Sequence, residues 1–286
     1  MVSPLGRKRM IDSILNENSK KSLKSFLKTC ESIIDIDTEM ALDVVTEHLK
    51  YHEGKEYSKI KLSKILELEK RWYKSLEENN PDYSVYSDPY YFCEVWLCWT
   101  KYSRNYLKEI SRRKVLNTNK TIVNDIDAKV VVDLGCGFGY TTAGLKELFP
   151  KAKVYGTNIK DSSQYKFAVD LGIKRKFEVV DSFDNIKADL IFASEYFEHF
   201  SNPIEHLKDV IIKCNPKYMV VANSFGAKAI GHFMSYGNIS SSKMENIFSE
   251  NMIHNGYTKT ETSCWNDRPK YWKKNIGKNI KHVLYD

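Results

Sequence analysis

The chain has 286 residues and a mass of 33.3 kDa, enough for one α/β domain of ordinary size with an appendage, or for two small domains. Its 42% hydrophobic and 28% charged residues and its mean hydropathy of -0.48 exclude a wholly disordered, collagenous or membrane-spanning chain. The net charge is +7, and six scattered cysteines without a CxxC pair indicate buried thiols in a reducing compartment.

The first dozen residues are basic, but no apolar run of signal-peptide length follows them. No stretch of the chain reaches the roughly 18 apolar residues that a bilayer crossing requires. We therefore expect a cytoplasmic protein without a membrane partner. The oligomeric state is left open.

The first part of the chain has helical periodicity. Apolar residues recur three and four positions apart in segments 10–15, 23–27 and 62–68, and the polar cluster 78–82 separates two helices. Segment 83–106 is dense in aromatic residues, of which Phe92, Trp96, Trp99 and Tyr102 form one stripe at helical spacing. The favoured interpretation is that this stripe packs a helix onto the following domain's sheet. We expect residues 1–127 to form a helical substrate or lid domain.

Basic residues gather in two segments. Residues 101–120 hold seven basic residues against one acid, and residues 259–286 hold seven against three. Such patches attract phosphate-bearing substrates, although a solvated helix face and a basic tail are the commoner explanation.

After residue 127, short β-branched runs alternate with helical stretches, which is typical of βαβ units. We expect strands at 129–134, 153–159, 177–181, 189–194 and 218–225, and helices from 140 to about 150 and at 162–171, 202–214 and 244–255. Segments 258–265 and 270–274 predict a terminal hairpin. Residues 128–286 are thus predicted to form a Rossmann-like α/β domain with a seven-stranded, mostly parallel sheet and a terminal antiparallel hairpin.

A glycine-rich turn follows the first of these strands, with the pattern Gly135-x-Gly137-x-Gly139. Glycines let a ligand approach the backbone closely, and the helix N-terminus behind them offers free N–H groups. A dinucleotide fingerprint requires G-x-G-x-x-G and an acid at the end of the next strand, where this chain has Asn158. Hydride transfer therefore fits poorly.

Residues 132–139, VDLGCGFG, resemble the first motif of class I S-adenosylmethionine-dependent methyltransferases. The resemblance implies that S-adenosylmethionine is the cofactor and that its methionine part lies at Asp133, Gly135, Cys136 and Gly137. It also places Asn158 at the ribose, where the family usually has an acid, and Asp181 and Ser182 at the adenine. The block 189–203 resembles the ubiquinone-biosynthesis-like branch of the family, with Glu195 in the cofactor cleft.

Glu195-x-x-Glu198-His199 follows the fourth strand. If this segment is helical, the three side chains could converge on a divalent cation such as Mg²⁺. It is similar to two groups of metal-assisted O-methyltransferases: ubiquinone-pathway enzymes and enzymes that methylate the 2′-hydroxyl at the 3′ end of small RNAs. The alternative is that Glu195 lines the cofactor cleft, Glu198 caps a turn and His199 is structural.

His232 follows the fifth strand and is a candidate general base or additional metal ligand, or else a satisfied structural histidine. Asn223 could orient the acceptor group. The resemblance further suggests a lid in which Tyr86 or Tyr90 lies near the sulfonium and Arg104 reaches the methionine carboxylate.

These observations predict a methyltransferase that acts on a hydroxyl or amine of a small metabolite or nucleotide unit, with Glu195, Glu198, His199 and His232 as catalytic candidates. One alternative is a nucleic-acid methyltransferase that uses the basic and aromatic N-terminal segment. Another is an inactive cofactor-binding or scaffold protein, which Asn158 keeps open. The chain has no Pro-Cys pair, which argues against cytosine-C5 methylation.

Overall fold

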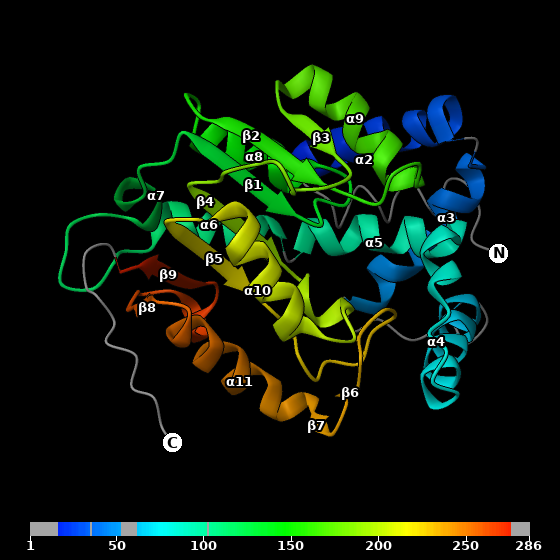
Figure 1. Ribbon diagram of the computed structural model, residues 1–286. Helices are drawn as coiled ribbons and strands as arrows, with labels where there is room; N and C mark the ends of the chain where they lie inside the picture. Colours follow the sequence, from blue (N-terminus) through cyan, green and yellow to red (C-terminus); the bar gives the residue numbers. More distant parts are fainter. Residues whose placement is uncertain (1–16, 35, 53–61, 102, 276–286) are drawn as a thin grey trace.

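A seven-stranded sheet forms the centre of the computed structural model, which describes residues 17–34, 36–52, 62–101 and 103–275 (Figure 1). Its strands are β1 (Val130–Leu134), β2 (Lys153–Thr157), β3 (Glu178–Val180), β4 (Leu190–Ser194), β5 (Tyr218–Ala222), β8 (Tyr257–Thr260) and β9 (Lys270–Lys274). The order is β3-β2-β1-β4-β5-β9-β8. The first five strands pair in parallel, β9 pairs antiparallel with β5, and β8 pairs antiparallel with β9. The predicted sheet with its terminal hairpin is confirmed.

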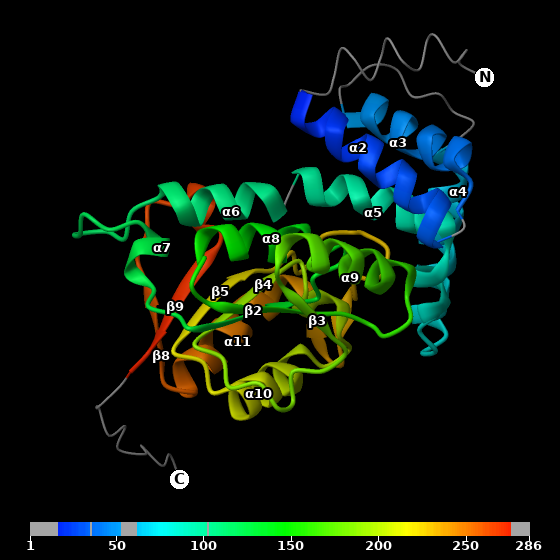
Figure 2. The same cartoon turned by 90° about the horizontal axis from the view of Figure 1, so that it is seen from above.

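Helices cover both faces of the sheet (Figure 2). One face carries α8 (Tyr140–Leu148) and α9 (Ser163–Arg175), and the other carries α10 (Pro203–Cys214) and α11 (Ser241–His254). Successive side chains of β1 pack on opposite faces of the sheet: Val131 belongs to the core under α8 and Val132 to the core under α10. Both are fully buried, as expected for a central parallel strand.

Local capping sets the helix ends. The Ser162 hydroxyl accepts from the Tyr165 N–H at the start of α9, and Lys176 in left-handed conformation ends that helix four residues later than the sequence predicts. Asn202 caps α10, and Pro203 lies in its first turn.

The N-terminal part is helical, as predicted. Its elements are α2 (Glu17–Thr29), the short π-helix η1 (Cys30–Ile34), α3 (Thr38–His52), α4 (Leu62–Glu77), the 3₁₀ helix η2 (Tyr83–Ser87), α5 (Pro89–Lys101), α6 (Ser103–Arg112) and α7 (Ile122–Asp125). Figure 2 shows α5 and α6 lying across the outer side of α8 and α9, with α2, α3 and α4 beyond one end of the sheet. Gly144 of α8 admits the Leu107 side chain of α6, since a Cβ at 144 would lie 2.4 Å from Leu107 Cδ1.

The aromatic stripe of α5 is buried, but its partners differ from the sheet that the sequence predicts. Trp96 stacks on Phe26 of α2 at 4.7 Å between ring centroids, and Phe92 contacts Phe138 of the glycine turn at 4.8 Å. Tyr102, predicted as part of this stripe, lies outside the described residues. The stripe therefore joins the N-terminal helices to the glycine turn.

Within the described part of the chain, no helix is long and apolar enough to cross a membrane. The described cysteine side chains are free and buried, as predicted. The side chain of Cys98 and residues 276–286 of the basic tail lie outside the described residues.

Candidate active site

The end of β2 braces the glycine turn. The N–H of Gly135 donates to Thr157 Oγ1 at 3.0 Å, and the N–H of Cys136 donates to the Thr157 carbonyl at 2.8 Å. Asn158 Nδ2 donates to the Gly137 carbonyl at 2.7 Å. Three successive residues of the turn are thus held by two successive residues of the neighbouring strand.

The turn is open at Gly137 and covered at Gly135. Both have positive φ, +52° and +64°. A Cβ at Gly137 would meet only Gln164 Oε1, at 3.6 Å, whereas a Cβ at Gly135 would lie 2.4 Å from Tyr196 Cδ2. Tyr196 is itself fixed, because its hydroxyl lies 2.9 Å from His206 Nε2. A ligand can therefore approach the backbone at Gly137 more freely than at Gly135.

Asp133 lies at the end of β1 below the turn and is only 2% exposed. The Thr142 hydroxyl donates to its Oδ2 at 2.7 Å. Burial raises the pKa of Asp133 to about 7, although that hydrogen bond lowers it. Burial also raises the pKa of the Cys136 thiol, so the thiol is protonated at neutral pH.

The other predicted cofactor residues follow β2 and β3 or come from α6. Asp181 and Ser182 are exposed, and Asp181 Oδ2 lies 3.9 Å from Lys160 Nζ. Arg104 is half-buried on α6 and forms no ion pair with any described residue. Their contacts with a cofactor stay predictions.

Glu195 follows β4 in a left-handed conformation, with φ of +51°. A positive φ is uncommon outside glycine and asparagine and is often found at functional sites. Its backbone N–H donates to the Ala222 carbonyl of β5 at 2.8 Å, which extends the sheet pairing past the strand end. Its Oε1 accepts a 2.8 Å hydrogen bond from the Tyr106 hydroxyl of α6. The carboxylate is therefore held between the sheet and an N-terminal helix.

Glu198 lies in the 3₁₀ turn η3 (Phe197–His199) and is fully buried. Its Oε1 accepts from the Ser224 N–H at 2.7 Å, while its Oε2 has no hydrogen-bond partner among the described residues. Burial, and then the neighbouring Glu195 carboxylate, raise the pKa of Glu198 well above its usual value. An unpartnered buried carboxylate oxygen is costly, so this atom requires either a proton shared with the Glu195 carboxyl or a ligand.

His232 completes the cluster. Its Nδ1 lies 3.0 Å from the Ala227 carbonyl, so Nδ1 carries the proton and Nε2 is left as an acceptor. Burial lowers the pKa of His232 and favours the neutral ring. One ligand atom from each of Glu195, Glu198 and His232 lies within 4.8 Å of the others.

His199, predicted as the third metal ligand, is not part of this group. Its Nδ1 lies 3.0 Å from the Tyr86 hydroxyl, and its ring lies 4.7 Å from the His232 ring, centroid to centroid. Burial lowers the pKa of His199 to about 3. The left-handed backbone at Glu195 prevents the continuous helix that would have aligned Glu195, Glu198 and His199, and His232 takes the third place.

The cluster suits a divalent cation. Carboxylate oxygens and a neutral imidazole nitrogen are common ligands of Mg²⁺, Mn²⁺ and Zn²⁺ in combination. Glu198 Oε2 has no hydrogen-bond partner among the described residues, and His232 Nε2 is left as an acceptor. Asn223 Oδ1, next to Ser224, is likewise buried without a partner in the described chain.

Sequence patterns gave no signal for three residues that build this site. Tyr106, Thr157 and Ser224 contact Glu195, Gly135 and Glu198 through hydrogen bonds between distant segments. Tyr106 stood in the aromatic segment and Ser224 next to the candidate Asn223, but neither was itself predicted.

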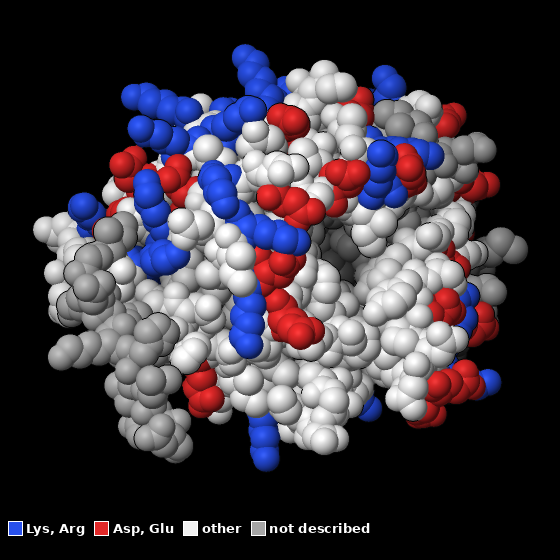
Figure 3. All heavy atoms as spheres, viewed as in Figure 1, with Lys and Arg blue, Asp and Glu red and all other residues white. Residues whose placement is uncertain are grey.

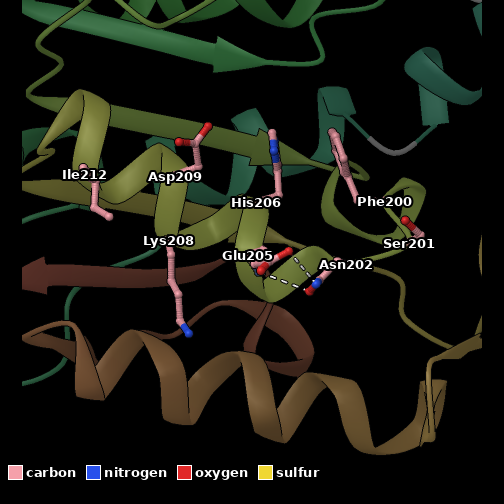
Figure 4. A pocket seen from close by; sticks show the side chains of 8 residues that line it. All are labelled: Phe200, Ser201, Asn202, Glu205, His206, Lys208, Asp209 and Ile212. Carbon is pink, nitrogen blue, oxygen red and sulfur yellow. Dashed lines mark hydrogen bonds between the residues drawn. The ribbon is translucent and has the colours of Figure 1, made fainter.

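The surface is hollowed between the ends of the parallel strands and α5 (Figure 3). A separate open hollow lies along α10, lined by Phe200, Ser201, Asn202, Glu205, His206, Lys208, Asp209 and Ile212 (Figure 4). None of the residues predicted for cofactor or substrate lines this second hollow. The chemical groups therefore gather at the sheet edge and not on α10.

Comparisons with known proteins agree with this geometry. Residues 132–213 match the family model of a methyltransferase domain, a span that holds the glycine turn, Glu195 and Glu198. No curated protein sequence matches the chain.

Solved structures share the fold. An O-methyltransferase family protein from Burkholderia thailandensis is 12% identical, with coverage of 84% of this chain and 72% of that chain and a TM-score of 0.51. A putative O-methyltransferase from Nostoc punctiforme is 12% identical, with coverage of 73% and 68% and a TM-score of 0.46. The plantazolicin methyltransferase BpumL, solved with a pentazolic desmethylPZN analog and SAH, is 18% identical, with coverage of 69% and 81% and a TM-score of 0.43. The family model identifies residues 132–213 as a methyltransferase domain, and the strand order and glycine turn of the structure agree with it.

Proposed function

We propose that the protein transfers the methyl group of S-adenosylmethionine to a hydroxyl or amine of a small metabolite or nucleotide unit. The observation that carries this proposal is the convergence of Glu195, Glu198 and His232 at the same strand ends as the glycine turn. Ligands of doubly wound sheets bind at these carboxyl ends, so a cofactor at the turn would present its methyl group toward the cluster.

The reaction would be a direct in-line displacement at the methyl carbon. Catalysis then depends on placing the acceptor and on removing one proton from it. Neutral His232 can accept this proton at Nε2 while no cation is bound there; with a cation on Nε2, His232 is a ligand and the proton of the acceptor hydroxyl leaves to solvent. Glu195, fixed by Tyr106, and buried Glu198 position the acceptor.

A divalent cation such as Mg²⁺ held by Glu195, Glu198 and His232 would bind an acceptor hydroxyl and lower its pKa. His199 supports the cluster through its ring contact with His232. In the same proposal, the cofactor is held by Asp133, Gly137, Asn158, Asp181 and Ser182. The lid over the cofactor includes Tyr90 and Arg104.

Glu198→Gln tests the proposal. This change keeps the shape of the side chain but removes a charged ligand, so we expect loss of cation binding and of methyl transfer, with binding of S-adenosylhomocysteine retained. Calorimetric titrations with Mn²⁺ and with S-adenosylhomocysteine, and transfer of a labelled methyl group with and without EDTA, measure the three properties. Glu205→Gln is the matched control, because Glu205 is exposed on α10.

Two results would contradict the proposal. Transfer that withstands both EDTA and Glu198→Gln would remove the cluster from the reaction. The absence of heat with both S-adenosylmethionine and S-adenosylhomocysteine would instead identify the chain as a scaffold.

A further inference from the structure

The two basic segments of the sequence share one surface. Val115, just after α6, forms a β-bridge with Thr262 in the loop between β8 and β9. The N–H of Leu116 donates to the Glu261 carbonyl at 2.9 Å, and the N–H of Lys114 donates to Ser263 Oγ at 3.0 Å. Residues far apart in the sequence are thereby fixed side by side.

This loop presents an exposed tryptophan. Trp265 is 73% exposed, although tryptophan is normally among the more buried residue types. Its backbone is fixed, because its N–H donates to Glu109 Oε2 of α6 at 3.0 Å and its carbonyl accepts from the Arg268 N–H at 3.1 Å. A ring on a fixed backbone loses little conformational freedom when a flat ligand stacks on it.

The charge around this ring is positive. Two acids that contact this segment are neutralised, since Glu109 pairs with Arg113 at 2.9 Å and Asp267 pairs with Lys259. Glu261, exposed in the same loop, is the opposing charge and forms no ion pair with a described residue. The remaining cations are exposed and form no ion pair within the described ranges: Arg112, Lys114, Lys120 and Arg268. Together with Leu116 and Trp265 they form what we call the Trp265 surface.

The Trp265 surface is continuous with the active site through α6. Tyr106 and Glu109 are three residues apart on this helix, about one turn or roughly 5 Å along its axis. Tyr106 donates to Glu195 of the acidic cluster, and Glu109 accepts from Trp265. Burial and the Glu195 carboxylate raise the pKa of the Tyr106 hydroxyl, and the Arg268 charge opposes them.

We propose that the Trp265 surface binds a single-stranded nucleic acid, with one base stacked on Trp265 and its phosphates held by the surrounding lysines and arginines. Aromatic faces interleaved with cations are the means by which proteins hold single strands, because every base has a face to stack and every linkage a charge. The inference rests on the proposed function for its chemistry: the nucleotide nearest the cluster would be the methyl acceptor. It differs from the sequence-based expectation, since the α5 aromatics expected to stack bases are partly buried in the core, and Trp265 takes their place.

Binding of fluorescein-labelled single-stranded RNA and DNA, followed by anisotropy at several salt concentrations, tests the proposal. Trp265→Ala should weaken binding about 5- to 100-fold, the range for loss of one stacked base, while Trp265→Phe should retain most of it. Lys114→Gln should reduce the slope of log affinity against log salt by about one. Lys151→Gln is the matched control, because Lys151 is exposed at the opposite, amino edge of the strands.

The outcomes separate this inference from the proposed function. Wild-type protein that binds S-adenosylhomocysteine but no oligonucleotide would overturn the Trp265 surface and leave the methyltransferase intact. So would equal losses with Lys151→Gln and Lys114→Gln, or binding that Trp265→Ala does not change. Binding to phosphatidylserine vesicles that competes with and exceeds binding to oligonucleotides would assign the surface to a membrane instead.

Discussion

Asn158 Nδ2 donates a 2.7 Å hydrogen bond to the Gly137 carbonyl, and its Oδ1 accepts a 2.8 Å bond from the Ile159 N–H. Both halves of the amide are therefore engaged within the chain. At the position where the resemblance to methyltransferases implies a ribose-binding acid, this chain has an amide that braces the glycine turn. A carboxylate could not replace it, because a carboxylate has no proton to donate to a carbonyl.

Asn158→Asp, which restores the residue usual in the family, is therefore expected to weaken cofactor binding. The new carboxylate would repel the Gly137 carbonyl and displace the turn. Asn158→Ala loses both hydrogen bonds, of which only the one to the Gly137 carbonyl braces the turn. That bond is worth about 1 kcal/mol or roughly 5-fold in affinity, and Asn158→Asp should exceed that loss. Calorimetric titration with S-adenosylhomocysteine measures both. Tighter binding by Asn158→Asp would show that the side chain leaves Gly137 and serves the ribose.

Gly135→Ala and Gly137→Ala are expected to differ although both sites have positive φ. The backbone strain of about 1 kcal/mol is common to the two variants. Only Gly135→Ala forces a methyl group against the Tyr196 ring, which adds about 1–3 kcal/mol of overpacking. Urea unfolding should show the larger loss for Gly135→Ala, and Gly137→Ala should instead lose cofactor affinity. Equal losses of stability would mean that Tyr196 moves aside freely.

Tyr106→Phe should release the Glu195 carboxylate. The hydroxyl donates to a charged acceptor, an interaction worth about 1.5–3 kcal/mol, so we expect a roughly 10- to 100-fold higher Mn²⁺ concentration for half-activation. Tyr165→Phe on α9 provides a control outside the cluster. An unchanged Mn²⁺ requirement would show that Glu195 is positioned by its backbone alone.

The elements that could be predicted from the sequence are those determined by residues close together in the chain. The buried run of β1, the glycine turn and the Ser162 and Asn202 caps each depend on neighbours within a few residues, and the structure confirms the elements that they predict. The helix that was to align Glu195, Glu198 and His199 does not form. Its loss depends on the left-handed backbone of Glu195, where the chain continues pairing with β5 at Ala222.

Contacts between distant segments could not be derived from the sequence. His232 joins Glu195 and Glu198 because the loop after β5 folds back over η3, with the Phe233 N–H donating to the Glu198 carbonyl at 3.3 Å. The pairing of Val115 with Thr262 is of the same kind. Charge counts identified both basic segments, but only the fold shows that they meet around Trp265.

Asp133 should make stability fall as pH rises. Its pKa is about 7 in the folded protein against 3.8 for an exposed side chain, mainly because it is buried. Between about pH 4 and pH 7 the unfolded chain releases a proton that the folded chain retains, so the free energy of unfolding decreases by up to about 4 kcal/mol. Asp133→Asn keeps an acceptor for Thr142 but cannot titrate, so its stability relative to wild type should improve between pH 5 and pH 8. Urea unfolding at the two pH values measures the free energy of unfolding of Asp133→Asn relative to wild type. The other titratable groups are the same in both proteins, so their contributions cancel in this difference.

Asp189→Asn supplies the control for that measurement. Although burial opposes it, the Lys217 ion pair and two backbone N–H donors hold the pKa of Asp189 below its usual value. Its contribution to stability is therefore complete above the unfolded pKa and is lost only at lower pH, so the deficit of Asp189→Asn should be constant from pH 5 to pH 8. If Asp133→Asn showed the same constant difference, Asp133 would be ionised in the folded protein throughout this range, and a polar environment would have to reach it beneath the glycine turn.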